Sequence, residues 1–277
     1  IENTNDAFKI VDIIGNLKKD KKELIKEIEV KNIEITWFSD CIVISSPYSI
    51  DYLKILLDIV QQMQSELIHR GILLRGGITL GECFHKSERL FGPAMNEAYS
   101  LESKVASVPR IILSTKIIAF LNESHNFEEE YQERRFKQDL DEYQAYNTSD
   151  ITDSFISEVT VASQIYREYL RRDKDGHYFV NYLDFIINMS IDEIRNDDEP
   201  YPHDMSYSGN KKYYKSMYKD TILPLKKFIQ DNLVGDNMSV ILKYVWLKDY
   251  YNETLDGYGG RITPEFKLDI FDKMYIK

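Results

Sequence analysis

The sequence predicts an α+β fold, in which a mixed sheet carries helices on one face and a mainly helical extension follows. Two observations lead to this prediction. Over about the first 115 residues, segments rich in branched and aromatic residues alternate with segments of helical period, in the order helix, hairpin, helix, strand, helix, strand. From about residue 128 charged residues are frequent, and long amphipathic segments follow. We therefore expect a domain over residues 1–127 and a charged insertion with a helical extension over residues 128–277.

Composition narrows the class of protein. The chain has 277 residues, of which 43% are hydrophobic and 29% charged, as in an ordinary globular protein. Its net charge of −11 counts against nucleic acid as a partner, because affinity for a phosphate backbone rests on clustered Lys and Arg. Two cysteines, Cys41 and Cys83, are too few for a disulfide framework, so we expect a reducing, cytoplasmic location. No run of about 18 apolar residues occurs, so we expect no membrane-spanning helix.

The first two elements are a helix and a hairpin. Residues 5–20 have a helical period, with apolar side chains at Phe8, Val11 and Leu17. Residues 33–46 are rich in branched and aromatic residues and are interrupted only by the polar pair Ser39–Asp40. Two apolar arms around a short polar break are typical of a β-hairpin.

A second helix follows the hairpin. Either Ser49 or Asp51 can cap its first turn, and Gly71 is a suitable residue for its end. Between them the apolar residues recur on one helical face. They are Leu53, Leu56, Val60, Met63 and Leu67.

Residues 72–84 predict a further strand, in which Gly76 and Gly77 indicate close approach of another part of the molecule to the backbone. Gly92 and Pro93 then open a third helix, since proline suits the first helical turn. We expect the apolar residues of this helix to face inward. They are Met95, Ala98 and Val105.

The remaining elements are predicted more coarsely. Residues 108–114 read as a strand, and residues 177–187 as a strand or the start of a helix. The helices of the extension are expected over residues 213–232 and 238–251. Residues 128–145 are expected to form an exposed charged insertion, and the turn-rich loops are expected over residues 196–210 and 256–263.

Three fragments carry a resemblance to a known family. They are WFSDCIVIS at residues 37–45, RGGITLGE at residues 75–82, and FGPAMNEAYSLES at residues 91–103, which RIILS follows. In order and spacing they resemble the class III nucleotide cyclase homology domain over about residues 5–115. The resemblance implies a ferredoxin-like cyclase sandwich. It also implies attack of the 3′-oxygen of a nucleoside triphosphate on its own α-phosphate, assisted by two Mg²⁺ or Mn²⁺ ions.

The resemblance assigns one metal ligand in this sequence. Asp40 matches the family aspartate in the hairpin turn, and carboxylate oxygens suit Mg²⁺. Aspartate is also common in turns without any metal role. The family has a second metal aspartate on its first strand. Asp12, in VDIIGN, is the alternative for that residue, but its surroundings are helical, and we expect the first strand and its aspartate to precede Ile1.

The helix at residues 93–103 carries the expected catalytic residues. Asn96 matches the family asparagine that holds the substrate ribose. Ser100 stands where the family has an arginine that stabilises charge on the α-phosphate, which is a departure from the family pattern. Lys104 follows at the same helical spacing, so it is either a substitute for that arginine or an exposed surface lysine.

Two positions match the base-selecting residues of the family. Thr36 and Arg89 occupy them. They match neither the Lys and Asp that read the base in adenylate cyclases nor the Glu and Cys that read it in guanylate cyclases. A hydroxyl and a guanidinium suit carbonyl oxygens such as those of uracil, and the ring of Trp37 or Phe38 would fill the volume that a small base leaves. This pattern resembles the bacterial pyrimidine cyclases of Pycsar antiphage defence, which implies UTP or CTP as substrate and cyclic UMP or cyclic CMP as product.

The resemblance also implies a head-to-tail homodimer with two composite sites. Two alternatives stay open. One is an adenylate or guanylate cyclase with an unusual base code. The other is a degenerate cyclase-homology module that binds nucleotide without catalysis, which Ser100 and the unseen first metal aspartate favour.

Overall fold

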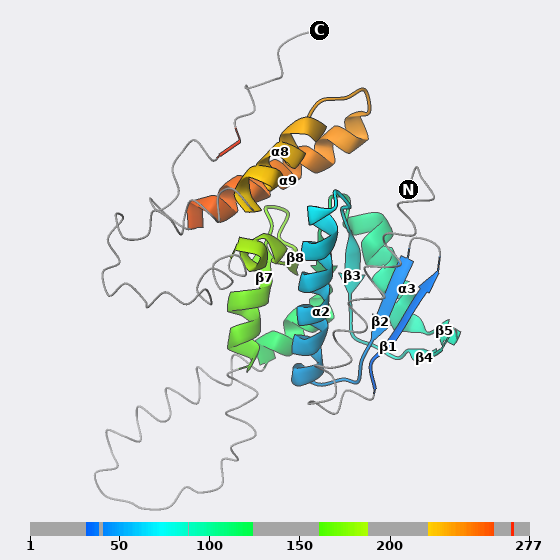
Figure 1. Ribbon diagram of the computed structural model, residues 1–277. Helices are drawn as coiled ribbons and strands as arrows, with labels where there is room; N and C mark the ends of the chain where they lie inside the picture. The colour runs from blue at the N-terminus through cyan, green and yellow to red at the C-terminus, as the bar shows by residue number, and fades with distance from the viewer. Residues whose placement is uncertain are drawn as a thin grey trace, which may run out of the picture. The chain divides into compact units, whose positions relative to one another are not determined.

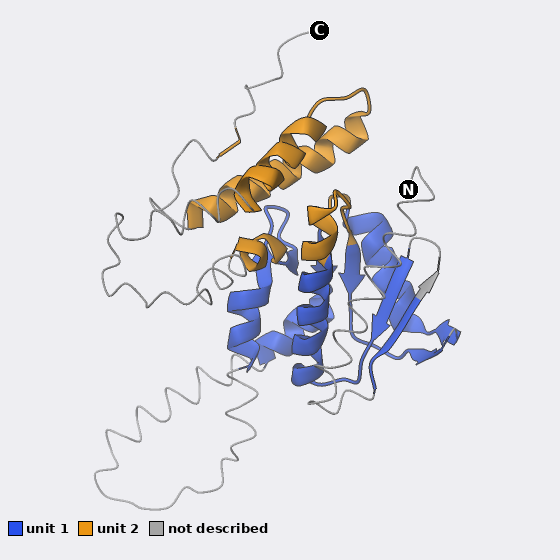
Figure 2. Cartoon of the chain, viewed as in Figure 1, with its two compact units in different colours: residues 1–63, 76–106, 110–180 blue, residues 64–75, 107–109, 181–277 orange. Residues whose placement is uncertain are grey.

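The computed structural model describes residues 32–38, 41–87, 89–123, 161–187, 221–257 and 267–268 (Figure 1). The predicted helix at residues 5–20, the charged insertion at 128–145 and the loop at 196–210 lie outside these residues. The chain forms two compact units (Figure 2). Unit 1 comprises residues 1–63, 76–106 and 110–180, and unit 2 comprises residues 64–75, 107–109 and 181–277.

The predicted hairpin is confirmed. Strands β1 (Glu34–Phe38) and β2 (Cys41–Ser45) pair antiparallel, with Glu34 opposite Ser45 and Phe38 opposite Cys41. Both strands are rich in branched and aromatic residues, which favour a pleated, half-buried surface. The pairing leaves only Ser39 and Asp40 to connect the strands, and these two residues lie outside the described part of the chain.

Helix α2 (Ile50–His69) begins and ends where the sequence predicts. Of the two capping candidates, Ser49 caps the helix, because its Oγ accepts a hydrogen bond from the Tyr52 N–H at 3.2 Å. At the other end Gly71 has φ +76°, and its N–H donates to the Ile68 carbonyl while the Ile72 N–H donates to the Leu67 carbonyl. Glycine tolerates this left-handed conformation, which ends the helix in a Schellman motif.

Unit 1 contains a four-stranded mixed sheet, so the α+β class is confirmed. Its strands lie in the order β3 (Gly76–Ile78), β6 (Ile111–Leu113), β8 (Tyr178–Val180) and β7 (Leu170–Arg172). Strands β3 and β6 are parallel, and the other two pairs are antiparallel. Unit 1 therefore extends past the expected boundary at residue 127, because β7 and β8 complete its sheet.

The prediction of one strand over residues 72–84 is wrong. Strand β3 ends at Ile78, opposite the last residue of β6, Leu113. The Ser114 N–H still donates to the Ile78 carbonyl at 2.8 Å, but a helix over residues 115–123 then removes the pairing partner. The chain resumes as a separate hairpin of β4 (Phe84–Lys86) and β5 (Arg89–Phe91).

Helices cover both faces of the β3–β6 pair, which corrects the expectation of helices on one face. Ile78 shares an apolar cluster with α2, drawn beside the sheet in Figure 1. Gly77 points the opposite way, because neighbouring residues of a strand alternate between faces. A Cβ atom on Gly77 would lie 2.5 Å from the Leu101 Cβ, so a second helical segment packs there. The core residues of unit 1 include Leu53, Leu57, Val60, Ile111, Leu113, Ile117, Leu121, Ile165 and Val180.

Unit 2 is mainly helical in its described part, as expected of the extension. Helices α8 (Leu223–Asn232) and α9 (Met238–Gly257) confirm the predicted helices at 213–232 and 238–251 within the described residues. The Tyr250 hydroxyl donates to the Asn181 Oδ1 at 2.7 Å and accepts from the Leu183 N–H at 3.0 Å. Buried polar groups of this kind need such partners, and here one tyrosine holds the start of the helix at residues 182–187.

Candidate functional site

One face of the β1–β2 hairpin carries polar side chains. Residues that are directly opposite on antiparallel strands share a face, as do alternate residues of one strand. Glu34 lies opposite Ser45, and Thr36 is two residues further along β1. Their three side chains therefore share one face, which meets His85 of β4.

His85 bridges the two strands of that hairpin. Its Nε2 lies 2.9 Å from the Thr36 Oγ1, and its Nδ1 lies 2.8 Å from the Ser45 Oγ. The Thr36 hydroxyl in turn donates to the Ser87 carbonyl at 2.6 Å. Ser87 has φ +56°, an uncommon conformation for a residue other than glycine, and the bond from Thr36 braces this turn between β4 and β5.

Burial lowers the pKa of His85, and the nearby carboxylate of Glu34 opposes this effect. The lowered pKa favours the neutral imidazole at pH 7. A neutral ring has one donor and one acceptor nitrogen, so the two contacts of His85 have defined directions. Sequence reasoning missed this residue, because its partners lie 40 and 49 positions away.

Arg89 lies on the exposed face of the β4–β5 hairpin. Along each strand the middle residue, His85 or Leu90, is half-buried, while the outer residues are exposed. Arg89 pairs with Lys86 across the hairpin, beside the stacked rings of Phe84 and Phe91, whose centroids are 4.9 Å apart. None of the described hydrogen bonds of Thr36 goes to Arg89; they go to His85 and Ser87.

Helix α3 (Pro93–Ser100) opens as predicted, with Gly92 as N-cap and Pro93 in the first turn. Asn96 is exposed on this helix, and Ser100 is half-buried. Met95 and Ala98, which the sequence predicts to face inward, are only half-buried, and no residue of α3 is fully buried.

The chain then widens into a π-helix, η1 (Leu101–Val105), closed by a 2.8 Å bond from the Ala106 N–H to the Leu101 carbonyl. Four residues span slightly more than a turn of α-helix but slightly less than a turn of π-helix, so the two offsets nearly cancel and Lys104 stays near the face that carries Asn96 and Ser100. Lys104 itself is exposed.

The close backbone approach predicted at the paired glycines is confirmed at Gly77. A Cβ there would lie 2.5 Å from the Leu101 Cβ and 2.7 Å from the Ala98 carbonyl oxygen. The glycine thus seats α3 and η1 against β3, which is a packing role. At Gly76 the same test gives an ordinary contact with Ile111.

Several predicted site residues lie outside the described part of the chain. Asp40 and Asp12 are among them, and for Trp37 and Phe38 the backbone strand is described but the side chains are not. Within the described residues no group of three or more His, Cys, Asp or Glu side chains gathers as a metal site would. Of the other candidates, Thr36 lies on β1, Arg89 on β5, Asn96 and Ser100 together on α3, and Lys104 on η1, all in unit 1.

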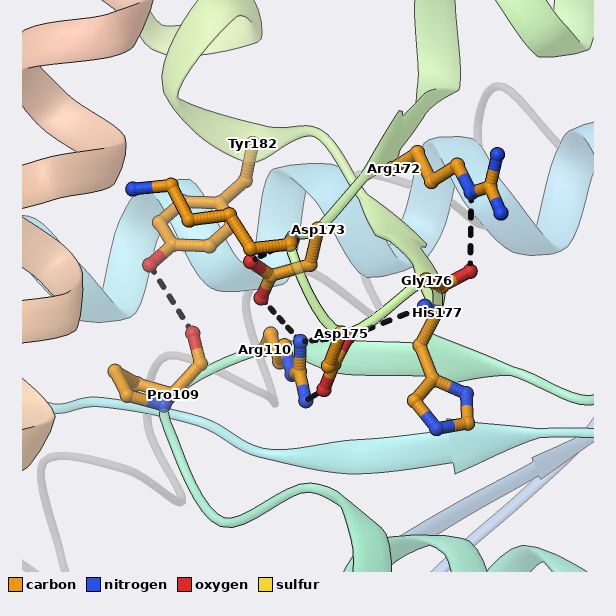
Figure 3. Close-up of polar contacts among 9 residues, drawn as sticks. Pro109, Arg110, Arg172, Asp173, Asp175, Gly176, His177 and Tyr182 are labelled. Atoms are coloured by element: carbon orange, nitrogen blue, oxygen red, sulfur yellow. Dashed lines mark hydrogen bonds and ion pairs between the residues drawn. The ribbon is translucent and has the colours of Figure 1, made fainter.

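A second polar cluster surrounds Arg110, at the start of β6 (Figure 3). Arg110 is buried, and its guanidinium donates to Asp173 and to both carboxylate oxygens of Asp175. Both aspartates belong to the turn between β7 and β8, in which the Lys174 N–H donates to Asp173 and the His177 N–H to Asp175. Arg110 therefore clamps this turn to the sheet, and the sequence carried no signal that joined residues 63 and 65 positions apart.

The Arg110 clamp predicts a dependence of stability on pH. Its hydrogen bond to Asp175 lowers the pKa of that carboxyl below the ordinary 3.8. A carboxyl whose pKa is lower in the folded state stabilises the fold above its unfolded pKa and loses that contribution as pH falls through the folded pKa. We therefore expect the urea concentration at the midpoint of unfolding to decrease as the pH is lowered below about 5. The fall should be smaller in Asp175→Asn, and an equal fall in that variant would contradict the assignment.

In the part of the chain that the structure describes, no helix combines the length and apolar character needed to cross a membrane. No family model, no curated protein and no solved structure matches the chain.

Proposed function

We propose that this protein is a nucleotide cyclase that converts a nucleoside triphosphate, UTP or CTP, into the 3′,5′-cyclic monophosphate and pyrophosphate. The main support is the pairing of Phe38 with Cys41, which leaves only Ser39 and Asp40 to connect two strands. A carboxylate in such a connection is what the resemblance requires of a metal ligand. Further support comes from α3, which opens at Gly92 and carries Asn96 exposed.

In this proposal the residues position the substrate and balance its charge. Divalent cations held by Asp40 would lower the pKa of the 3′-hydroxyl and neutralise the phosphates. The 3′-oxygen bonds to the α-phosphorus, the bond from that phosphorus to the bridging oxygen breaks, the hydroxyl proton passes to solvent, and pyrophosphate leaves. Asn96 holds the ribose. Ser100 can donate one hydrogen bond to the α-phosphate but brings no charge, so Lys104 or the cations must supply it.

Replacing Asp40 by alanine is expected to lower product formation at least about a hundredfold, because one carboxylate ligand of the cations is lost. The measurement incubates the protein with each of the four nucleoside triphosphates and Mn²⁺ and identifies the products by mass spectrometry. Asp51→Ala is the matched control, since Asp51 is an exposed carboxylate in the first turn of α2. Full activity in Asp40→Ala would remove the metal role, and unchanged urea unfolding would show that the fold is intact.

The same assay separates the alternatives. Cyclic AMP or cyclic GMP as product would indicate a purine cyclase with an unusual base code. Nucleotide binding without any cyclic product would indicate a degenerate module, which Ser100 in place of arginine favours. The head-to-tail homodimer belongs to the proposal, because a composite site needs residues of two subunits. A cytoplasmic enzyme making a second messenger in antiphage signalling is the role that this reaction would serve.

A further inference from the structure

The hydrogen bonds around Thr36 define where its single proton lies. A backbone carbonyl can only accept, so the 2.6 Å contact with the Ser87 oxygen requires Thr36 to donate. The His85 Nε2 lies 2.9 Å from the same hydroxyl oxygen. With its proton already given to Ser87, Thr36 must accept there, so His85 carries its proton on Nε2.

The other nitrogen of His85 completes the assignment. In the neutral ring with Nε2–H, the Nδ1 is an acceptor, and the Ser45 hydroxyl lies 2.8 Å from it. Ser45 therefore donates to His85, His85 to Thr36, and Thr36 to Ser87. These hydrogen bonds all run in one direction, from Ser45 on β2 to His85 on β4, then to Thr36 on β1 and on to the turn between β4 and β5.

We propose that His85 is a specificity-determining residue that holds the Thr36 hydroxyl as an acceptor, so that the site takes a nucleobase through an N–H group. One lone pair of the Thr36 oxygen accepts from His85, and the second remains for a ligand. This inference rests on the proposed function, which makes Thr36 a base-reading residue. It replaces the expectation that the Thr36 hydroxyl donates to a carbonyl such as those of uracil.

The chemistry limits the ligand groups that fit. The amino group of cytosine and the N3–H of uracil are both donors, and either can satisfy the free lone pair. A carbonyl oxygen facing Thr36 would find no donor there, and we expect the missing hydrogen bond to lower affinity about tenfold. His85 touches Thr36 and has no role at the reacting phosphate in this proposal, so it acts as a positioning residue.

The first test reads the tautomer directly. Nitrogen NMR of the full chain should show His85 as the neutral Nε2–H form at pH 7, with the signal assigned by its loss in His85→Gln. Thr36→Val should change the Nε2–H shift, because the acceptor of that proton is removed. Finding the Nδ1–H tautomer in the wild-type protein would overturn the assignment of donors.

The second test measures binding of α,β-methylene triphosphates, whose bridging carbon prevents cyclisation. Cytidine is compared with N4,N4-dimethylcytidine, and uridine with N3-methyluridine, by titration calorimetry. In at least one pair, loss of the N–H should weaken binding about tenfold. In His85→Leu and in Thr36→Val, the ratio of the dissociation constants of the methylated and parent compounds should fall below about threefold. In His85→Gln the tenfold ratio should persist, because the glutamine amide also offers an N–H.

The outcomes separate this inference from the cyclase proposal. Equal binding within both pairs, no binding at all, or an unchanged ratio in His85→Leu would each overturn the role of His85. If the methylated compounds still bind more weakly to Thr36→Val, the weakening is steric, and this would also overturn the role of His85. If the ratio behaves as expected but the natural triphosphates give no cyclic product, the role of His85 stands and only the cyclase proposal fails.

Discussion

Replacing Arg110 by methionine is expected to destabilise the protein by about 3 kcal/mol. Arg110 is 3% exposed, and removal of its guanidinium takes away the cation that contacts the carboxylates of both Asp173 and Asp175. Breaking a buried ion pair costs about 3–5 kcal/mol, and the low end applies because the Asp175 side chain is 45% exposed. The free energy of unfolding from urea titration at pH 7 is the measurement.

Two controls distinguish the buried pair from an ordinary ion pair. Arg167 contacts Glu168 on the surface with its side chain 75% exposed, so Arg167→Met should change the free energy of unfolding by less than about 1 kcal/mol. Adding Asp173→Asn and Asp175→Asn to Arg110→Met should restore much of the lost stability, because no uncompensated charge remains. A triple variant as unstable as Arg110→Met alone would show that the effect comes from lost packing.

Replacing Gly77 by valine is also expected to lower the stability of the protein substantially. A Cβ at this position already lies 2.5 Å from the Leu101 Cβ and 2.7 Å from the Ala98 carbonyl oxygen, both on the helical segment that covers β3. Neither contact can relax by turning a side chain, so η1 and α3 must shift away from the sheet. Overpacking of this kind costs about 1–3 kcal/mol, and a branched side chain against backbone belongs at the upper end.

Urea unfolding of Gly77→Val measures this effect, with Gly235→Ala as the matched control. No atom lies within 4 Å of a Cβ on Gly235, so that substitution should leave stability within about 0.5 kcal/mol of the wild-type value. Because α3 carries Asn96, Gly77→Val should also lower any cyclase activity measured under conditions where the variant is folded. Wild-type stability in Gly77→Val would mean that the helix does not approach β3 so closely.

Elements with local signals could be predicted from the sequence. The β1–β2 hairpin follows from apolar arms around Ser39–Asp40, and the start of α3 follows from Gly92 and Pro93. The end of α2 follows from Gly71, which alone at that point tolerates the left-handed conformation. Each of these features depends on a few consecutive residues, so no distant part of the chain is needed to specify it.

Features that depend on distant partners could not be predicted. Strand β3 stops at Ile78 because β6 gives way to a helix, and its own residues carry no sign of this. The widening of the helix at Leu101–Val105 likewise has no local signal, and we have no physical account of why it occurs there. For the candidate site the sequence supplied Thr36 as a position to examine, but not the residue that orients it.

By itself the sequence determined the α+β class, the caps and turns of its early elements, and the fragments that resemble the cyclase family. Only the tertiary structure decided that helices cover both faces of the β3–β6 pair, that His85 sets the direction of the Thr36 hydroxyl, and that Arg110 holds the turn between β7 and β8. The physical reason is the separation in sequence between the residues that interact. Backbone conformation responds to neighbours along the chain, whereas hydrogen bonds and ion pairs between buried side chains form only where folding has brought distant residues together.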